Sequence, residues 1–148
     1  MIPQPTIRAG RRDDAGELAR LIRVLGYDTT EADIAARWPE WESAETTVLV
    51  APMPDGTLAG LATLHRMAVL HRPRPVGRIT ALVVDERTRG KGVGRALVLA
   101  AETSLREAGC GLLEITSNLR LTEAHSFYEH LEYERTSFRF AKKLATDS

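Results

Sequence analysis

A glycine-rich loop with basic neighbours is the part of this sequence whose residue types and spacing could do chemistry. The glycines of RTRGKGVGRALV, residues 87–98, occupy alternate positions: Gly90, Gly92 and Gly94. The basic residues interleave with them: Arg89, Lys91 and Arg95. If a helix begins here, its free N–H groups and its positive end would bind an anion. A solvated turn that caps the helix is the alternative, and glycine spacing alone does not decide between them.

Two common phosphate-binding patterns do not fit this loop. The P-loop pattern G-x-x-x-x-G-K-[ST] needs a hydroxyl residue after its lysine, but Gly92 follows Lys91. The dinucleotide pattern G-x-G-x-x-G needs a glycine where Arg95 stands. Glu114, the candidate for a ribose-binding acid, lies in the middle of LLEITS instead of at a strand end. Both nucleotide interpretations are therefore disfavoured.

The segments around the loop alternate between strand and helix patterns. Strand patterns cover residues 5–10, both arms of a hairpin around PDG within 46–70, 76–86, 110–118 and 135–144. Helix patterns cover residues 11–27, 29–44, 95–109 and 121–133. The loop thus follows a strand and opens a helix. The order β-α-α-β-β-β-α-β-α-β predicts an α/β fold with one mixed sheet (α+β) in a single domain, residues 1–148.

The loop also fits R/Q-x-x-G-x-G/A, the acyl-CoA pyrophosphate signature of the GCN5-related N-acetyltransferases, the GNAT family. ITALVVDERTRGKGVGRALV resembles that family's central strand, loop and helix, and AHSFYEHLEYE resembles its next helix, which carries a tyrosine. The element order agrees, so the resemblance covers nearly the whole chain. It implies the GNAT acyl-CoA N-acyltransferase fold, in which helices flank a central mixed sheet and the fourth and fifth strands splay apart.

The resemblance further implies a site for acetyl-CoA. The pyrophosphate would bind the loop's N–H groups, beside an arginine at the family's Gln/Arg position; the residues are Arg89, Gly90, Lys91, Gly92, Val93, Gly94 and Arg95. The pantetheine arm would pair with the backbone of Leu82 and Val84. Many members contact pantetheine with an asparagine whose position here is Leu121, so Asn118, three residues earlier, is the available substitute.

Tyr128 matches the tyrosine that the family often uses to protonate the departing CoA thiolate. A thiolate of pKa near 8.5 can take a proton or a hydrogen bond from a phenol of pKa near 10. A packed core aromatic is the alternative role. The strand glutamate that several members use as a base is replaced by Arg78, which leaves Glu114, an acid within an apolar strand, as the substitute. A salt-bridged strand residue is the alternative role for Glu114.

Acceptor specificity is expected from segments outside this shared core. Tyr27, Trp38 and Trp41 could form one wall of an acceptor site, or the tryptophans could pin a short helix to the sheet. Residues 65–78, HRMAVLHRPRPVGR, collect histidines and arginines that would favour an acceptor with a carboxylate or phosphate if they face the cleft. A solvated hairpin loop is the commoner meaning of such a run. Glu132 replaces the family's glycine after the tyrosine helix, at a cost on the order of 1 kcal/mol if it adopts the left-handed conformation.

Composition narrows the class of partner. Lys and Arg number 20 and Asp and Glu number 20, so no basic surplus favours nucleic acid. The single Cys110 excludes an internal disulfide, and no motif predicts a metal site. No apolar run approaches the roughly 18 residues of a membrane span. We therefore expect a cytoplasmic protein that uses no metal, membrane or nucleic acid, with a homodimer through the last strand as an open expectation.

Two functions fit these residues. The first is an enzyme that transfers the acetyl group of acetyl-CoA to a primary amine of a small molecule, protein or peptide, by direct attack in a ternary complex with Tyr128 as general acid. The second is a non-catalytic acyl-CoA sensor or regulatory module. Tyr128 favours the enzyme, and the absence of the strand glutamate leaves the sensor as the alternative.

Overall fold

The computed structural model describes residues 5–116, 122–137 and 139–145, and the chain divides into two compact units, Met1–Thr116 and Ser117–Ser148. The elements of the first unit are β1 (Arg8–Ala9), α1 (Ala15–Val24), α2 (Glu31–Trp41), β2 (Thr46–Pro52), β3 (Leu58–Met67), β4 (Val76–Val84), α3 (Val93–Glu107) and β5 (Leu112–Ile115). Short 3-10 turns, η1 (Arg12–Asp14) and η2 (Glu86–Thr88), precede α1 and follow β4.

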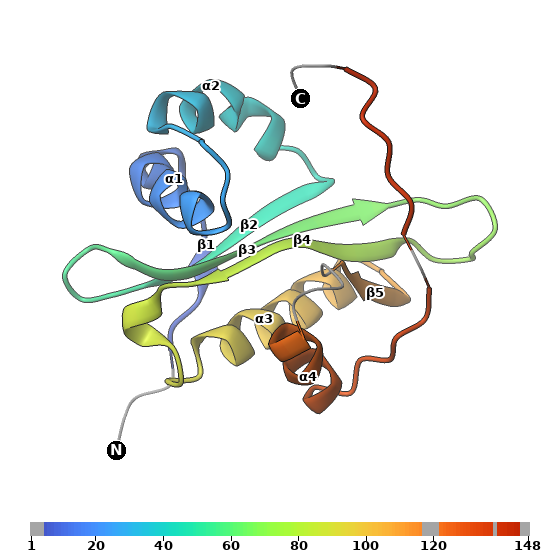
Figure 1. Cartoon of the computed structure of the whole chain (residues 1–148). Coiled ribbons are helices and arrows are strands. Elements are labelled where there is room, and N and C mark those ends of the chain that lie inside the picture. Colours follow the sequence, from blue (N-terminus) through green and yellow to red (C-terminus); the bar gives the residue numbers. More distant parts are fainter. Residues whose placement is uncertain (1–4, 117–121, 138, 146–148) are drawn as a thin grey trace. The chain divides into compact units, whose positions relative to one another are not determined.

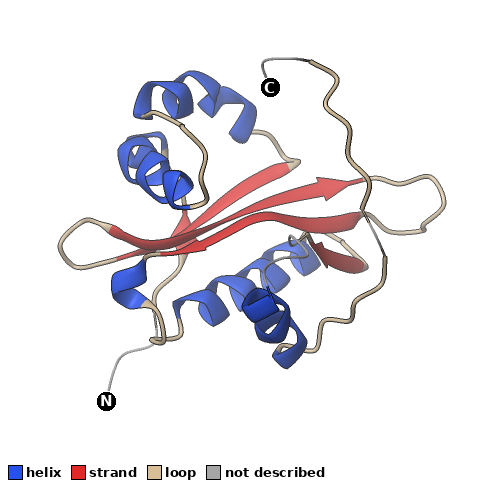
Figure 2. Ribbon diagram, in the orientation of Figure 1, coloured by secondary structure: helices blue, strands red, loops and turns tan. Residues whose placement is uncertain are grey.

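The first unit is a five-stranded sheet between helices, with strand order β1-β2-β3-β4-β5. The pairs from β1 to β4 are antiparallel, and β4 and β5 are parallel, so the sheet is mixed, as predicted. Figure 1 shows α1 and α2 over one face of the sheet and α3 over the other. The hairpin predicted around PDG joins β2 to β3, and Figure 2 shows the sheet strands in red.

Amphipathic helices bury the α1/α2 face of the sheet. Leu18 and Leu21 of α1 and Trp38 of α2 join a buried cluster with side chains from β2, β3 and β4. The start of α2 is fixed by a reciprocal cap, in which Thr30 N–H donates to Asp33 and Asp33 N–H donates to the Thr30 hydroxyl at 3.1 Å. On the opposite face, Leu97 and Leu105 of α3 are buried against the sheet.

Strand β4 carries an irregularity and then loses its parallel partner. The β3–β4 register shifts between Thr63 and Leu64, so Thr80 is an extra residue in β4, a β-bulge. The β4–β5 ladder ends at the pair Ile79–Ile115, while β4 continues to Val84. In the described chain, β4 beyond Ile79 therefore has no partner on the β5 side, as the predicted splay requires.

The second unit holds α4 (Thr122–His130), which ends in a Schellman motif. Tyr133 N–H donates to Tyr128 O at 3.1 Å, and Glu132 N–H donates to Glu129 O at 3.0 Å. Glu132 takes the left-handed conformation, φ 71°, at the position where the family has glycine.

The closing strand predicted over residues 135–144 is wrong for the part of it that the structure describes. Neither 134–137 nor 139–145 is assigned to a strand. Phe140 and Leu144 are 92% and 94% exposed. Alternating apolar residues indicate a strand only where a hydrogen-bonding neighbour and a packing surface exist, and this segment has neither in the described structure.

Candidate acyl-CoA site

A network of charged side chains anchors the turn that leads into the glycine loop. Asp85, buried at the end of β4, accepts hydrogen bonds from Arg87 Nη2 at 2.9 Å and from Arg20 Nη1 at 3.0 Å. Arg20 also pairs with Glu17 at 2.9 Å, and Glu17 accepts Leu58 N–H at 2.8 Å. The Arg87 side chain, then its N–H group, holds the pKa of Asp85 well below the usual range, with a smaller effect from Arg20. The network ties α1, β3 and η2 together.

The loop itself presents unpaired N–H groups at the start of α3. Gly90 and Gly92 have positive φ values, 80° and 83°, which a side chain would disfavour. Lys91 N–H donates to Thr88 O at 3.3 Å, so this group, included in the predicted set, is already engaged. Within the described chain the remaining N–H groups have no acceptor: Gly90, Gly92, Val93, Gly94 and Arg95.

The charge around these N–H groups is positive. Arg89, Lys91 and Arg95 are exposed, and none of them forms an ion pair with another described residue. The first turn of α3 contains no acidic residue. An anion at this helix end would therefore meet free donors, the positive end of the helix and three exposed cations without competition from a carboxylate.

The edge of β4 beyond the splay offers backbone groups for pairing. Asp85 N–H donates to Ala59 O of β3 at 2.8 Å. Successive residues of a strand direct their N–H and C=O groups to opposite sides, so Val83 also faces β3 while Leu82 and Val84 face away from it. No described strand pairs with β4 on that side beyond Ile79. Leu82 and Val84 thus direct their backbone N–H and C=O groups toward the edge of β4 that no described strand occupies.

Glu114 and Arg78 form an ion pair just before the splay. Arg78 pairs in register with His65 of β3 and with Glu114 of β5, and Arg78 Nη2 donates to Glu114 Oε1 at 3.0 Å. A Cβ on the preceding Gly77 would lie 2.6 Å from Leu105 of α3, so Arg78 faces the opposite side of the sheet, the α1/α2 face. The salt-bridge alternative for Glu114 is thus what the structure contains.

Tyr128 lies in α4, in the second unit. It is half-buried, and its ring contacts those of Phe127 and Tyr133 at centroid distances of 5.4 and 6.4 Å. Burial raises the pKa of its hydroxyl group above the ordinary value. The phenol is therefore protonated at neutral pH, the state that a general acid needs.

The family model named Acetyltransferase (GNAT) family matches residues 16–133. This chain belongs to the GNAT acetyltransferase family. The match extends across the glycine loop, β4 and Tyr128, so the family resemblance seen in the sequence is confirmed.

Relatives and solved structures agree with this assignment. The chain is 37% identical to an aminoalkylphosphonate N-acetyltransferase of Salmonella typhimurium over 90 residues, 61% of this chain and 58% of that protein's length. It is 30% identical to an aminoglycoside N(6')-acetyltransferase type 1 of Stenotrophomonas maltophilia over 135 residues, 89% of this chain and 88% of that protein. A Trypanosoma brucei acetyltransferase structure shares the fold, with a TM-score of 0.82, 24% identity, and coverage of 94% of this chain and 99% of that one.

Other predicted residues of this GNAT protein fall outside the loop and β4. Asn118 lies outside the described residues. Trp38 is buried in the core and Trp41 packs against it, so both pin α2 to the sheet, whereas Tyr27 is 65% exposed. Arg66 donates to Ala108 O at the end of α3, which places it on the face opposite Arg78. The charged network at Asp85 was missed, because its members are far apart in the sequence.

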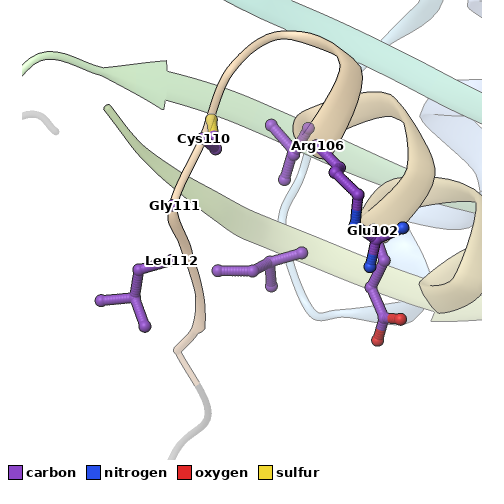
Figure 3. A pocket seen from close by; sticks show the side chains of 7 residues that line it. Glu102, Arg106, Cys110, Gly111 and Leu112 are labelled. Atoms are coloured by element: carbon purple, nitrogen blue, oxygen red, sulfur yellow. The ribbon is translucent and has the colours of Figure 1, made fainter. Parts of the chain in front are cut away.

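A hollow on the first unit lies at the opposite end of α3 from the glycine loop. Figure 3 shows Glu102 and Arg106 of α3 on one side of it and Leu112 of β5 on the other. Burial raises the pKa of the Cys110 thiol at its edge. None of the predicted site residues lines this hollow, so it adds nothing to the acyl-CoA site; the lining residues are Glu102, Leu105, Arg106, Cys110, Gly111, Leu112 and Leu113.

The described residues contain no cluster of three or more His, Cys, Asp or Glu side chains that could hold a metal ion. Among the helices of the described chain, none has the length and apolar character to cross a bilayer.

Proposed function

We propose that this protein is an N-acetyltransferase that transfers the acetyl group of acetyl-CoA to a primary amine. The observation that carries the proposal is the free N–H groups at Gly90 and at the start of α3, which follow directly on the unpaired edge of β4. The names of two relatives, an aminoalkylphosphonate and an aminoglycoside acetyltransferase, describe acceptors that contain an amine.

The donor would bind along these two features in turn. Its pyrophosphate would accept hydrogen bonds from the loop N–H groups, with Arg89 and the neighbouring cations around it. Its pantetheine arm would then run along β4 from Val84 to Leu82 as an added strand. This path leads the thioester toward the splay, where the last β4–β5 pair is Ile79–Ile115.

The reaction is a direct displacement. The amine nitrogen attacks the thioester carbonyl carbon, the C–N bond forms, and the C–S bond breaks with its electron pair on sulfur. An acceptor that arrives as an ammonium ion loses one proton before attack and a second from the new amide nitrogen. The CoA thiolate takes up one proton, so each turnover releases one proton to solvent.

Two side chains are proposed for the proton transfers. Tyr128, a phenol that is protonated at neutral pH, would donate a hydrogen bond or its proton to the thiolate. Glu114 would accept a proton from the acceptor's ammonium, because its ion pair with Arg78 occupies only Oε1. Both roles require the group to come within hydrogen-bond reach of its substrate atom.

Calorimetric titration with acetyl-CoA tests the donor site, with NADH and ATP as controls. Binding of acetyl-CoA alone, followed by thiol release when a panel of primary amines is added, is the expected result. Binding without thiol release from any amine would favour the sensor alternative, and a folded protein that binds no acetyl-CoA would refute both. The cytoplasmic location and the homodimer also stay predictions; light scattering on the purified protein tests the latter.

A further inference from the structure

Arg78 and Glu114 are a partly exposed pair of opposite charges at the end of the β4–β5 ladder. Their ladder pair immediately precedes Ile79–Ile115, the last pair before β4 and β5 separate. Their side chains are 30% and 39% exposed, so solvent reaches both charges. If the thioester reaches the splay as proposed, an acceptor at this pair would lie next to it.

The ion pair leaves much of both side chains unused. A guanidinium and a carboxylate usually pair through two parallel hydrogen bonds. Here a single bond joins Nη2 to Oε1, and no other described residue bonds Nη1 of Arg78 or Oε2 of Glu114. Arg78 Nε is buried without any partner. Nη1 of Arg78 and Oε2 of Glu114 are therefore the atoms of the pair that are available to bind a third group.

The two charges together are complementary to a zwitterion. A carboxylate oxygen binds an ammonium group, and a guanidinium binds a carboxylate, phosphate or phosphonate. His65, the register neighbour of Arg78, adds a further polar group on the same face. A polycationic amine would be attracted by Glu114 but repelled by Arg78 at the adjacent position.

We propose that Arg78 and Glu114 select an acceptor that carries an anionic group close to its primary amine. Arg78 binds the anion and Glu114 binds the ammonium group, which orients the amine toward the thioester. This inference rests on the proposed acetyltransferase function and names its substrate class. It makes Arg78, which replaces the family's strand glutamate, a specificity-determining residue.

Matched acceptors that differ only in charge test the inference. We expect a kcat/KM for 3-aminopropanoate about 10- to 100-fold above that for 3-aminopropanamide, since a hydrogen-bonded charge pair is lost in the amide. Arg78→Met should remove this preference mainly through KM for the anion. Arg66→Met, which removes an arginine from the other face of the sheet, should keep it.

The charge-swapped double variant Arg78→Glu with Glu114→Arg separates recognition from structural support. It can restore a cross-strand ion pair, and with it the thermal stability, but it reverses the positions of the two charges. If the pair only supports the sheet, the swap will retain the preference for the anionic acceptor, and the inference is wrong. The preference is read from acceptor binding to the protein–CoA complex, because Glu114 is also the proposed base and its replacement would lower turnover. Loss of that preference at wild-type stability is the result we expect.

Binding measurements keep the two proposals apart. Calorimetry of both acceptors with the protein–CoA complex needs no turnover. A complex that prefers 3-aminopropanoate but never releases thiol with acetyl-CoA would refute the proposed function and support the acceptor site. Turnover of 3-aminopropanamide or spermidine that equals or exceeds the turnover of 3-aminopropanoate would support the proposed function and overturn this inference.

Discussion

Replacing Asp85 by Asn should destabilise the protein by about 1–3 kcal/mol at pH 7. Asp85 is the buried carboxylate that joins Arg20 of α1 to Arg87 of η2, with oxygen–nitrogen distances of 3.0 and 2.9 Å. The amide keeps an oxygen for Arg87 N–H but loses the negative charge that both guanidinium groups need. The expected loss is below the 3–5 kcal/mol typical of a fully buried pair, because Arg87 is 66% exposed and solvent screens it.

The size of this loss should depend on pH. The pKa of Asp85 lies below its unfolded value of about 4, so the ionised carboxylate stabilises the fold at pH values above that. The contribution falls as the pH drops below about 4 toward the folded pKa. Asn does not titrate, so the difference in the free energy of unfolding between wild type and variant should be largest at pH 7 and smaller at pH 3.

Urea unfolding at pH 7 and pH 3 measures both effects, with Asp55→Asn as the control. Asp55 accepts two hydrogen bonds from Thr57 in the exposed hairpin turn, so the same chemical change there should cost less. Equal losses in the two variants at pH 7, or a loss at Asp85 that is the same at both pH values, would refute the reasoning. Because η2 leads directly into Arg89, the Asp85 variant should also bind acetyl-CoA more weakly.

Four further substitutions test three separate features. Glu132→Gly should raise the free energy of unfolding by about 1 kcal/mol in urea unfolding, because glycine takes a positive φ without strain; no gain would contradict the strain argument. Gly92→Ala and Gly109→Ala should each lower the free energy of unfolding by about 1 kcal/mol, because both glycines have a positive φ. Calorimetry should show weaker acetyl-CoA binding only for Gly92→Ala, because only Gly92 lies among the loop N–H groups that face the proposed pyrophosphate. Tyr128→Phe should lower kcat at least about tenfold, within the range for general acid catalysis, with the Kd of acetyl-CoA unchanged; an unchanged kcat would remove Tyr128 from the mechanism.

Most of the fold was predictable because its signals are local. Helix α1 follows from apolar residues at helical spacing, and the hairpin follows from the turn PDG at residues 54–56. The position of the glycine loop between a strand and a helix was also predictable, because periodicity identifies both neighbours. The prediction of a closing strand was wrong for the opposite reason, since the alternation of apolar residues says nothing about whether a partner strand is present.

The charged network that holds the turn before the glycine loop could not be predicted in the same way. Glu17, Arg20 and Asp85 are charged residues with no spacing that links them, and each alone resembles a solvated surface residue. Only the packing of α1 on β3 and β4 brings them together. The sequence therefore predicts which residues offer N–H groups to a ligand, but not which side chains hold that backbone in place.

The side of the sheet that Arg78 faces depends on one extra residue. Strict alternation along β4 would place Arg78 on the same face as Leu82 and Val84. The bulge at Thr80 reverses this, so Arg78 shares the α1/α2 face with Ala81 and lies opposite His65 instead of Arg66. A bulge leaves no reliable mark in a single sequence. The sequence could thus show that an arginine replaces the family's glutamate, but only the register shows that it meets Glu114 where the strands part.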